Sequence, residues 1–398
     1  MSIFASIEQA PTDPILGISD AYRADPSPDK VNLGIGVYQD ESGKLPLLAA
    51  VREAVARIAA DPKPLGYQPM DGLPGFAAAT QELVFGKGSA AVASGRIVTV
   101  QTLAGTGALK LGADFLNRFS PGADILFSEP TWDNHAAVFG GAGLTIRAYR
   151  YYDRATGGVD FAGMCADIAD AKPGSIVLLH ACCHNPSGCD LDDSQWAEVV
   201  KLIGEKGLIP FFDMAYQGFA VGAEADAVGV RLAAESGITF LVANSYSKTF
   251  GLYGERIGGL SIGCADAAEA KRVLSRVKLC IRANYSNPPT QGATIVTTIL
   301  GDSELRASWE AEVASYRDRI RDMRGLLAEG LRANGVAETG FVTKQRGMFT
   351  FTGLSPEQMQ TLRGEYHIYG VDNGRICCAA LNTRNVEYVA VSLAKLLK

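Results

Sequence analysis

Short apolar runs alternate with helical stretches through residues 96–243, and this alternation limits the folds that the 398-residue chain can adopt. The runs have the length and the β-branched content of buried strands. Strands that alternate with helices predict an α/β domain with a mostly parallel sheet. The strands expected in this sheet are residues 96–101, 124–127, 144–149, 176–179, 208–212 and 239–243. The main helices expected between them are residues 108–119 and 193–206.

The rest of the chain predicts a second, smaller unit. After residue 267 the pattern becomes helical, and residues 308–327 have the apolar spacing and mixed charges of a long amphipathic helix. Short strands are expected at residues 31–37, 348–352 and 376–380. We therefore expect a large domain over residues 41–305 and a small α+β domain over residues 306–398. Residues 1–40, which are rich in turns up to residue 30, would form an N-terminal arm and part of the small domain.

Composition argues against several classes of protein. The chain is 47% hydrophobic and 20% charged, which is enough for a large core. Its net charge is -6 and it has no long basic run, so nucleic acid is not an expected partner. No apolar stretch reaches membrane-spanning length, so no membrane partner is expected, and residues 1–10 lack the layout of a signal peptide. We therefore expect a cytoplasmic protein.

The cysteines and histidines predict neither a disulfide framework nor a metal site. Eight cysteines and four histidines show none of the usual ligand spacings. The adjacent pairs Cys182-Cys183 and Cys377-Cys378 lie in or beside apolar runs. We interpret these four residues as buried small hydrophobes in a reducing cytosol.

Polar side chains follow five of the expected strands at the points where the strands end. Ligands of open α/β sheets bind beyond the carboxyl ends of the strands, so these side chains are candidates for one site. In chain order they are Gly105-Thr106-Gly107, Trp132, Asn185, Asp213 with Tyr216, and Lys248.

Three of these segments have an ordinary structural explanation beside the functional one. The glycine turn at residues 105–107 would suit a phosphate at a helix N-terminus, or it would simply connect a strand to a helix. Trp132 would stack on a planar ring, or it would fill the core. Asn185 would donate a hydrogen bond to a ring oxygen, or it would begin an Asn-Pro turn.

Asp213 and Lys248 carry more chemical information. Asp213 follows an apolar run, so its carboxylate needs a cationic partner unless it caps a helix. Lys248 lies in the strand-end turn NSYSKTFG, where desolvation disfavours the charged amine and makes it a nucleophile that can form a Schiff base with a carbonyl. Ser245, Ser247 and Arg256 would hold an anionic group beside it. The alternative for this turn is an ordinary surface loop.

Together these groups match what pyridoxal phosphate needs from a protein. A lysine forms the Schiff base, an aspartate pairs with the pyridinium nitrogen, and polar groups tune the ring oxygen. Five unrelated coincidences in strand order explain the pattern less well than one site does.

The motifs around these residues resemble the class I aminotransferases of the aspartate and aromatic-amino-acid subgroup. The resembling segments extend over essentially the whole chain and are residues 32–37 (NLGIGV), 184–188 (HNPSG), 213–218 (DMAYQG), 245–248 (SYSK), 251–256 (GLYGER), 282–289 (RANYSNPP) and 374–376 (GRI). The resemblance is nearest to the bacterial aromatic-amino-acid aminotransferases, with the aspartate aminotransferases very near. It implies a fold type I homodimer with each active site at the subunit interface.

The resemblance also implies roles in cofactor chemistry. Lys248 would form the Schiff base and move a proton between the α-carbon and the cofactor. Asp213 would keep the pyridine nitrogen protonated, with His135 supporting it from behind. Tyr216 and Asn185 would bind the ring hydroxyl oxygen.

The remaining implied roles concern the phosphate and the substrate. Trp132 would stack on the ring and contact the substrate. The phosphate would be bound by Gly105, Thr106, Ser245, Ser247 and Arg256, with Tyr67 from the other subunit. Arg375 would bind the substrate α-carboxylate as a bidentate fork, with Gly36 nearby, and the partner's Arg282 would pair with a distal carboxylate. Without the resemblance, both arginines would be interpreted as exposed.

Two features depart from the family pattern. Ala104 precedes the glycine turn where many relatives have Ser or Gly, so we assign it no phosphate contact. At the pocket rim, Asn287 and Val37 are aspartate-like. Gln39, Leu45 and Gly66 match neither pattern.

The expected activity is a pyridoxal-phosphate-dependent transamination of ping-pong type. An aromatic amino acid or aspartate would give its amino group to 2-oxoglutarate, which yields a 2-oxo acid and L-glutamate. A dedicated aspartate aminotransferase is the first alternative. A non-catalytic pyridoxal-phosphate-binding regulator is the second, but such proteins usually carry a DNA-binding segment, and no basic helix-turn-helix-like stretch is evident in this sequence.

Overall fold

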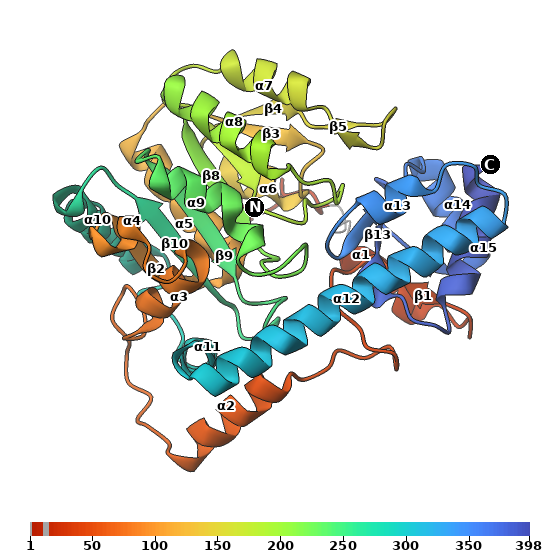
Figure 1. Cartoon of the computed structure of the whole chain (residues 1–398), viewed down its shortest axis with the longest axis horizontal. Coiled ribbons are helices and arrows are strands. Elements are labelled where there is room, and N and C mark those ends of the chain that lie inside the picture. Colours follow the sequence, from red (N-terminus) through yellow and green to blue (C-terminus); the bar gives the residue numbers. More distant parts are fainter. Residues whose placement is uncertain (1, 11–15) are drawn as a thin grey trace.

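The computed structural model describes residues 2–10 and 16–398, and this described part of the chain folds around a seven-stranded sheet (Figure 1). Across the sheet the strands follow the order β2-β10-β9-β8-β7-β3-β4. Their bounds are β2 Ile97–Leu103, β3 Asp124–Glu129, β4 Thr145–Arg150, β7 Ile176–His180, β8 Ile209–Met214, β9 Phe240–Ser245 and β10 Ile257–Gly263. Strand β10 is antiparallel to both neighbours, and every other adjacent pair is parallel. The predicted α/β fold with a mostly parallel sheet is confirmed, and the ends of β2, β3, β7, β8 and β9 share one edge.

Helices cover both faces of this sheet, which explains why its strands are almost continuously apolar. Alternate residues of one strand face opposite cores: Ile176 and Leu178 pack on one side, Val177 and Leu179 on the other. The first face is covered by α5 Ala104–Phe119, α6 Asn134–Gly140 and α10 Ala267–Asn284. The second is covered by α3 Phe76–Phe85, α4 Ala90–Ala93, α7 Phe161–Ala169, α8 Asp193–Glu205 and α9 Val228–Glu235.

The remaining elements include three small two-stranded sheets. They pair β1 Val31–Asn32 with β12 Ile368–Tyr369, β11 Phe349–Phe351 with β13 Arg375–Cys377, and β5 Tyr152–Asp153 with β6 Gly158–Val159. The other helices are α1 Leu16–Ala24, α2 Ala49–Ala60, α11 Gln291–Gly301, α12 Ser303–Ala333, α13 Gly340–Lys344, α14 Pro356–Tyr366 and α15 Val386–Leu397. Two short 3-10 helices are η1 Ala225–Ala227 and η2 Cys378–Ala380. Among the described residues, no helix combines the length and the apolar character needed to cross a bilayer.

Helix α12 has 31 residues and packs on helices from both early and late parts of the chain. It runs from beside α2 and α11 to α13 and α15 (Figure 1). The side chain of Asp302 caps its start by accepting the N–H groups of Glu304 and Leu305 at 2.9 and 3.0 Å. The helix contains the expected amphipathic stretch, residues 308–327. The expected domain boundary after residue 305 therefore falls in the first turn of a continuous helix.

Several expected boundaries were wrong for local reasons. The strand expected at residues 31–37 ends at Asn32. Leu33 still bonds to the backbones of Tyr369 and Cys377, but the next carbonyl, that of Gly34, accepts its hydrogen bond from the Arg375 side chain. The strand expected at residues 376–380 becomes the 3-10 turn η2 after Cys377.

The N-terminal boundaries also differ from the expectation. Within residues 1–30, which were expected to be rich in turns, the structure also forms α1. Helix α5 begins at Ala104 and not at residue 108, so the glycine turn is its first turn. Glycine is needed there because a Cβ on Gly105 would lie 3.1 Å from the Ser245 Cβ, and one on Gly107 would lie 2.9 Å from the Leu103 Cβ.

Candidate active site

A pocket of about 450 Å³ lies at the sheet edge where the strand ends meet. The predicted site residues that line it are Gly36, Gly105, Thr106, Trp132, Asn185, Asp213, Tyr216, Ser245, Ser247, Lys248, Arg256 and Arg375. These residues are distant in sequence, and the shared direction of the strands brings them together. Val37, which was expected at the pocket rim, and Ala104 also line the pocket. The other lining residues were given no role from the sequence and are Ile35, Leu109, His180, Ala215, Tyr253 and Phe349.

Lys248 lies in the turn that follows β9, with its amine inside the pocket. Burial lowers the pKa of this amine to about 8, although the nearby Asp213 charge opposes the shift. The Nζ atom lies 5.2 Å from the centre of the Tyr216 ring. Near neutral pH the neutral fraction of this amine is therefore far larger than that of an ordinary lysine, and only the neutral form is a nucleophile.

Asp213, near the end of β8, is buried and hydrogen-bonded from behind. His135 Nε2 donates to its Oδ2 at 3.0 Å, and the Thr131 hydroxyl lies 2.8 Å from His135 Nδ1. Burial acts to raise the pKa of the Asp213 carboxyl, but the His135 hydrogen bond and charge hold it below its usual value. The carboxylate therefore stays ionised in an otherwise apolar strand.

His180 extends this chain of hydrogen bonds. Its Nε2 lies 3.1 Å from the Thr131 hydroxyl, and burial lowers the pKa of His180 to about 3, so its ring is neutral at pH 7. His180 was not predicted as a site residue, although it is the last residue of β7 and the same strand-end position indicated Asp213 near the end of β8. His135 is fully buried and does not line the pocket, in agreement with its expected place behind Asp213.

The N-terminus of α5 faces a group of hydroxyl and guanidinium donors. Gly105 and Thr106 lie in the first turn of α5, where backbone N–H groups are free for an anion. Ser245 and Ser247 lie opposite, with their hydroxyls 3.2 Å apart. Arg256, exposed at the pocket mouth, takes the left-handed conformation with φ 52° and donates through Nη1 to the Tyr253 carbonyl at 2.9 Å. These donors would hold a phosphate.

Arg375 lies in the pocket wall on β13. Its Nη1 donates to Asn185 Oδ1 and its Nη2 to the Gly34 carbonyl, each at 2.9 Å. Its Nε is buried and has no hydrogen-bond partner among the described residues. Burial lowers the pKa of the guanidinium, so a carboxylate placed here would relieve a real electrostatic cost.

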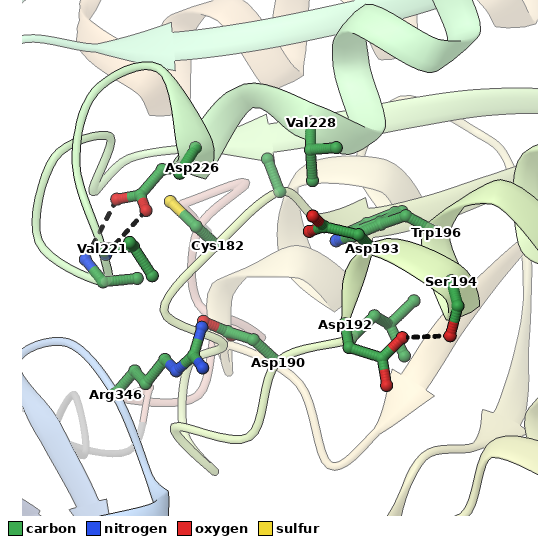
Figure 2. Close-up of a pocket in the computed structure, with 14 residues that line it drawn as sticks. Cys182, Asp190, Asp192, Asp193, Ser194, Trp196, Val221, Asp226, Val228 and Arg346 are labelled. Atoms are coloured by element: carbon green, nitrogen blue, oxygen red, sulfur yellow. Dashed lines mark hydrogen bonds between the residues drawn. The ribbon is translucent and has the colours of Figure 1, made fainter.

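The loop that carries Asn185 is held by a buried acid. Asp190 accepts the backbone N–H groups of Cys183 and His184, both at 2.8 Å. Asp190 also lines a second pocket, where Figure 2 shows it near Arg346. Burial raises the pKa of the Asp190 carboxyl to about 6.

Figure 2 shows Cys182 and Asp226 in this second pocket. Together with Cys183 they place a sulfur or carboxylate oxygen each within 4.8 Å of one another, a grouping that the sequence spacing did not reveal. The Asp226 carboxylate already accepts backbone N–H groups of Gly218, Ala220, Val221 and Gly222. A hydrogen bond between the two cysteines raises the pKa of Cys182, and burial raises the pKa of Cys183 to about 11. We interpret this cluster as the anchor of a loop, because its oxygens are saturated and its sulfurs are held as thiols. Both adjacent cysteine pairs are buried, as predicted.

Besides His135, two predicted site residues do not line this pocket. Tyr67 is 95% exposed. Arg282 is exposed at the end of α10 and donates to the Ser286 hydroxyl. Both were expected to act in the active site of the partner subunit.

Comparisons with known proteins agree on one family. The family model described as "Aminotransferase class I and II" matches residues 28–393. An aspartate aminotransferase of Pseudomonas aeruginosa is 50% identical, with 100% of each chain covered. An aromatic-amino-acid aminotransferase of Escherichia coli K12 is 46% identical, with 99% of this chain and 100% of the relative covered. The crystal structure of an aromatic-amino-acid aminotransferase from Burkholderia pseudomallei, covalently bound to pyridoxal phosphate, is 52% identical and has a TM-score of 0.97 over 100% of both chains.

The pocket fits pyridoxal phosphate by the chemistry of its donors. The α5 N-terminus with Ser245, Ser247 and Arg256 would hold the phosphate. The ionised Asp213 suits a protonated ring nitrogen, and the amine of Lys248 suits the aldehyde.

Proposed function

Because this chain belongs to the class I and II aminotransferases, we propose that it transfers the amino group of an aromatic amino acid or of aspartate to 2-oxoglutarate by a ping-pong mechanism. Pyridoxal-phosphate-dependent transamination is the activity of the family. The observation that carries the proposal is that Lys248, Asp213 and Arg375 line one pocket although they come from different parts of the chain. The products would be the 2-oxo acid and L-glutamate.

The bound cofactor supplies a carbon that exchanges amines and a ring that accepts electrons. Lys248 would hold it covalently and then carry a proton to and from the substrate α-carbon, which suits an amine with a pKa of about 8. Asp213, kept ionised by His135, would hold a proton on the ring nitrogen. Tyr216 and Asn185 would bind the ring oxygen, and Trp132 would stack on the ring.

Arg375 would bind the α-carboxylate that all amino acids share. Its guanidinium is held on two sides by Asn185 and Gly34, and its Nε is left without a partner within the described chain. Gly36 lies in the same pocket wall, where its lack of a side chain leaves room for the Phe349 ring.

We propose a homodimer in which the partner completes the pocket. A partner's tyrosine and arginine would supply a phosphate hydroxyl and a distal-carboxylate site, and the exposure of Tyr67 and Arg282 supports this. An aromatic ring would leave the guanidinium of Arg282 unpaired, which is costly in a closed site. Arg282 would then turn toward solvent, as a long side chain at an interface can.

Two further proposals concern the surroundings of the site. Residues 1–40 and 306–398 would form a small domain beside the large domain of residues 41–305, and the pairing of β1 with β12 supports this division. The protein would act in the cytoplasm, which its eight free cysteines support.

A donor panel with 2-oxoglutarate tests the proposal, with L-glutamate as the measured product. We expect turnover with phenylalanine, tyrosine and aspartate, and parallel double-reciprocal lines when both substrates are varied. Turnover with aspartate alone would favour the dedicated aspartate aminotransferase, which the 50% identical relative supports. Absence of L-glutamate with every donor would contradict the proposal.

A further inference from the structure

The register of the small β11–β13 sheet places an aromatic ring beside the guanidinium of Arg375. In this antiparallel pair Phe349 lies opposite Cys377, and Phe351 lies opposite Arg375. Phe349 and Arg375 are therefore diagonal neighbours, a separation that aromatic and long side chains can bridge. The Arg375 Cζ atom lies 4.2 Å from the centre of the Phe349 ring.

This ring stacks on a cation whose hydrogen bonds go to neutral oxygens. Both bonds of the guanidinium are to amide oxygens, those of Asn185 and Gly34. Burial lowers the pKa of Arg375, and the charge of Asp133 is among the influences that oppose this shift. The face of an aromatic ring carries negative potential and attracts a guanidinium, more strongly where water is excluded.

The ring itself is tightly confined. Phe349 is 3% exposed. A Cβ on Gly36 would lie 2.7 Å from the Phe349 Cζ, so the edge of the ring occupies the space that a side chain at Gly36 would need. The Tyr216 ring packs edge-on at 6.1 Å and 86°. The ring therefore cannot turn without moving the pocket wall.

We propose that Phe349 is a positioning residue, which holds the guanidinium plane of Arg375 in the orientation that binds the substrate carboxylate. This inference rests on the role proposed above for Arg375. A bidentate pair needs both N–H bonds in the carboxylate plane, so a plane fixed in advance loses less freedom when the substrate binds. The ring also offsets part of the cost of the buried charge before the substrate arrives.

Stepwise fluorination of Phe349 separates the electrostatic role from packing. Incorporation of phenylalanines with one, two or three ring fluorines reduces the negative potential on the face of the ring and nearly preserves the shape of the ring. The probe is 3-phenylpropanoate, an unreactive carboxylate, titrated into the pyridoxal-phosphate-loaded enzyme by calorimetry. We expect log Kd to rise with each fluorine and to reach roughly 5- to 20-fold weaker binding with three.

The kinetics of the same proteins supply the second measurement. The KM values for phenylalanine and aspartate should rise together while kcat stays within about twofold, because the carboxylate is bound in the ground state as well. Fluorination of Phe351, which packs on Tyr152 at 5.2 Å, is the matched control on the same strand and should leave Kd within about twofold.

A flat fluorine series at Phe349, with 3-phenylpropanoate binding still lost in Arg375→Leu, would overturn this inference and leave the proposed function intact. Unchanged binding in Arg375→Leu would instead overturn the carboxylate role of Arg375, and this inference with it. A graded loss at Phe349 with a flat series at Phe351 supports it.

Discussion

Arg375 and Arg282, the two arginines expected to bind substrate carboxylates, lie in opposite environments. Arg375 is 3% exposed, is held by Asn185 and Gly34, and stacks on Phe349. Arg282 is exposed, and its guanidinium bonds the Ser286 hydroxyl one turn away on the surface. The fold of one chain therefore holds the first guanidinium in place before any substrate binds, whereas the second is held at the surface by a single hydrogen bond.

This difference suits the two ends of the substrate. Every amino donor presents the same α-carboxylate, so a site with one fixed geometry can bind this group in all of them. The distal group is a carboxylate in aspartate and a ring in phenylalanine. An arginine at the surface can pair with the distal carboxylate of aspartate and turn away from the ring of phenylalanine, because an exposed guanidinium is solvated when it is unpaired.

The largest expected effect comes from Lys248, because every donor needs its proton transfer whichever arginine binds the donor's carboxylates. Lys248→Ala should keep the cofactor but lower kcat by roughly two to four decades for every donor, since the proton carrier is lost. Stopped-flow turnover with phenylalanine and aspartate measures this. Borohydride reduction of the wild-type protein should fix the cofactor to Lys248 alone. Label on another lysine would contradict the assignment.

The next effect tests the fixed arginine. Arg375→Leu should lower kcat/KM by roughly two to three decades for aromatic and acidic donors alike, because a charge-assisted bidentate pair is lost from each. Steady-state kinetics with both donor classes measure it. A loss confined to one class would show that Arg375 does not bind the shared carboxylate.

A smaller and one-sided effect tests the exposed arginine. Arg282→Leu should lower kcat/KM for aspartate and glutamate by roughly two decades and leave phenylalanine and tyrosine within about tenfold. Arg276→Leu, on the same helix, is the matched control and should change neither class. Equal losses for both classes would make Arg282 a structural residue.

The smallest effect concerns pH and Lys248. The folded protein lowers the pKa of the amine from 10.5 to about 8, so its neutral fraction rises as pH passes through 8. The rate at which cofactor-free protein takes up pyridoxal phosphate should therefore increase with pH, with a midpoint near 8. Absorbance during uptake measures this rate. A midpoint near 10 would show that the pocket does not desolvate the amine.

The large-domain part of the site was predictable because its residues follow strands. Lys248, Asp213 and Asn185 are found by one rule, that parallel strands end at the same edge. Phe349 was not found, since its contact with Arg375 depends on the register of β11 and β13, which short strands do not reveal. The strand predicted at residues 31–37 was too long. Residues 33–37 have a strand-like sequence, but the Gly34 carbonyl accepts a hydrogen bond from the Arg375 side chain.

Roles for Tyr67 and Arg282 could not be predicted from the residues alone. Nothing in their local pattern distinguishes them from other exposed side chains, and only the family resemblance indicated a role. Their function depends on a second chain, which no rule about strands or helices within one chain can place.

The central claim is that Lys248 and Arg375 of one chain work with Arg282 of its partner. Differently tagged Lys248→Ala and Arg282→Leu chains, co-expressed and purified as the mixed dimer, test it directly. The mixed dimer contains one site with every wild-type residue, so aspartate turnover should be about half that of the wild-type dimer. Turnover no higher than the mean of the two parent variants would contradict the claim.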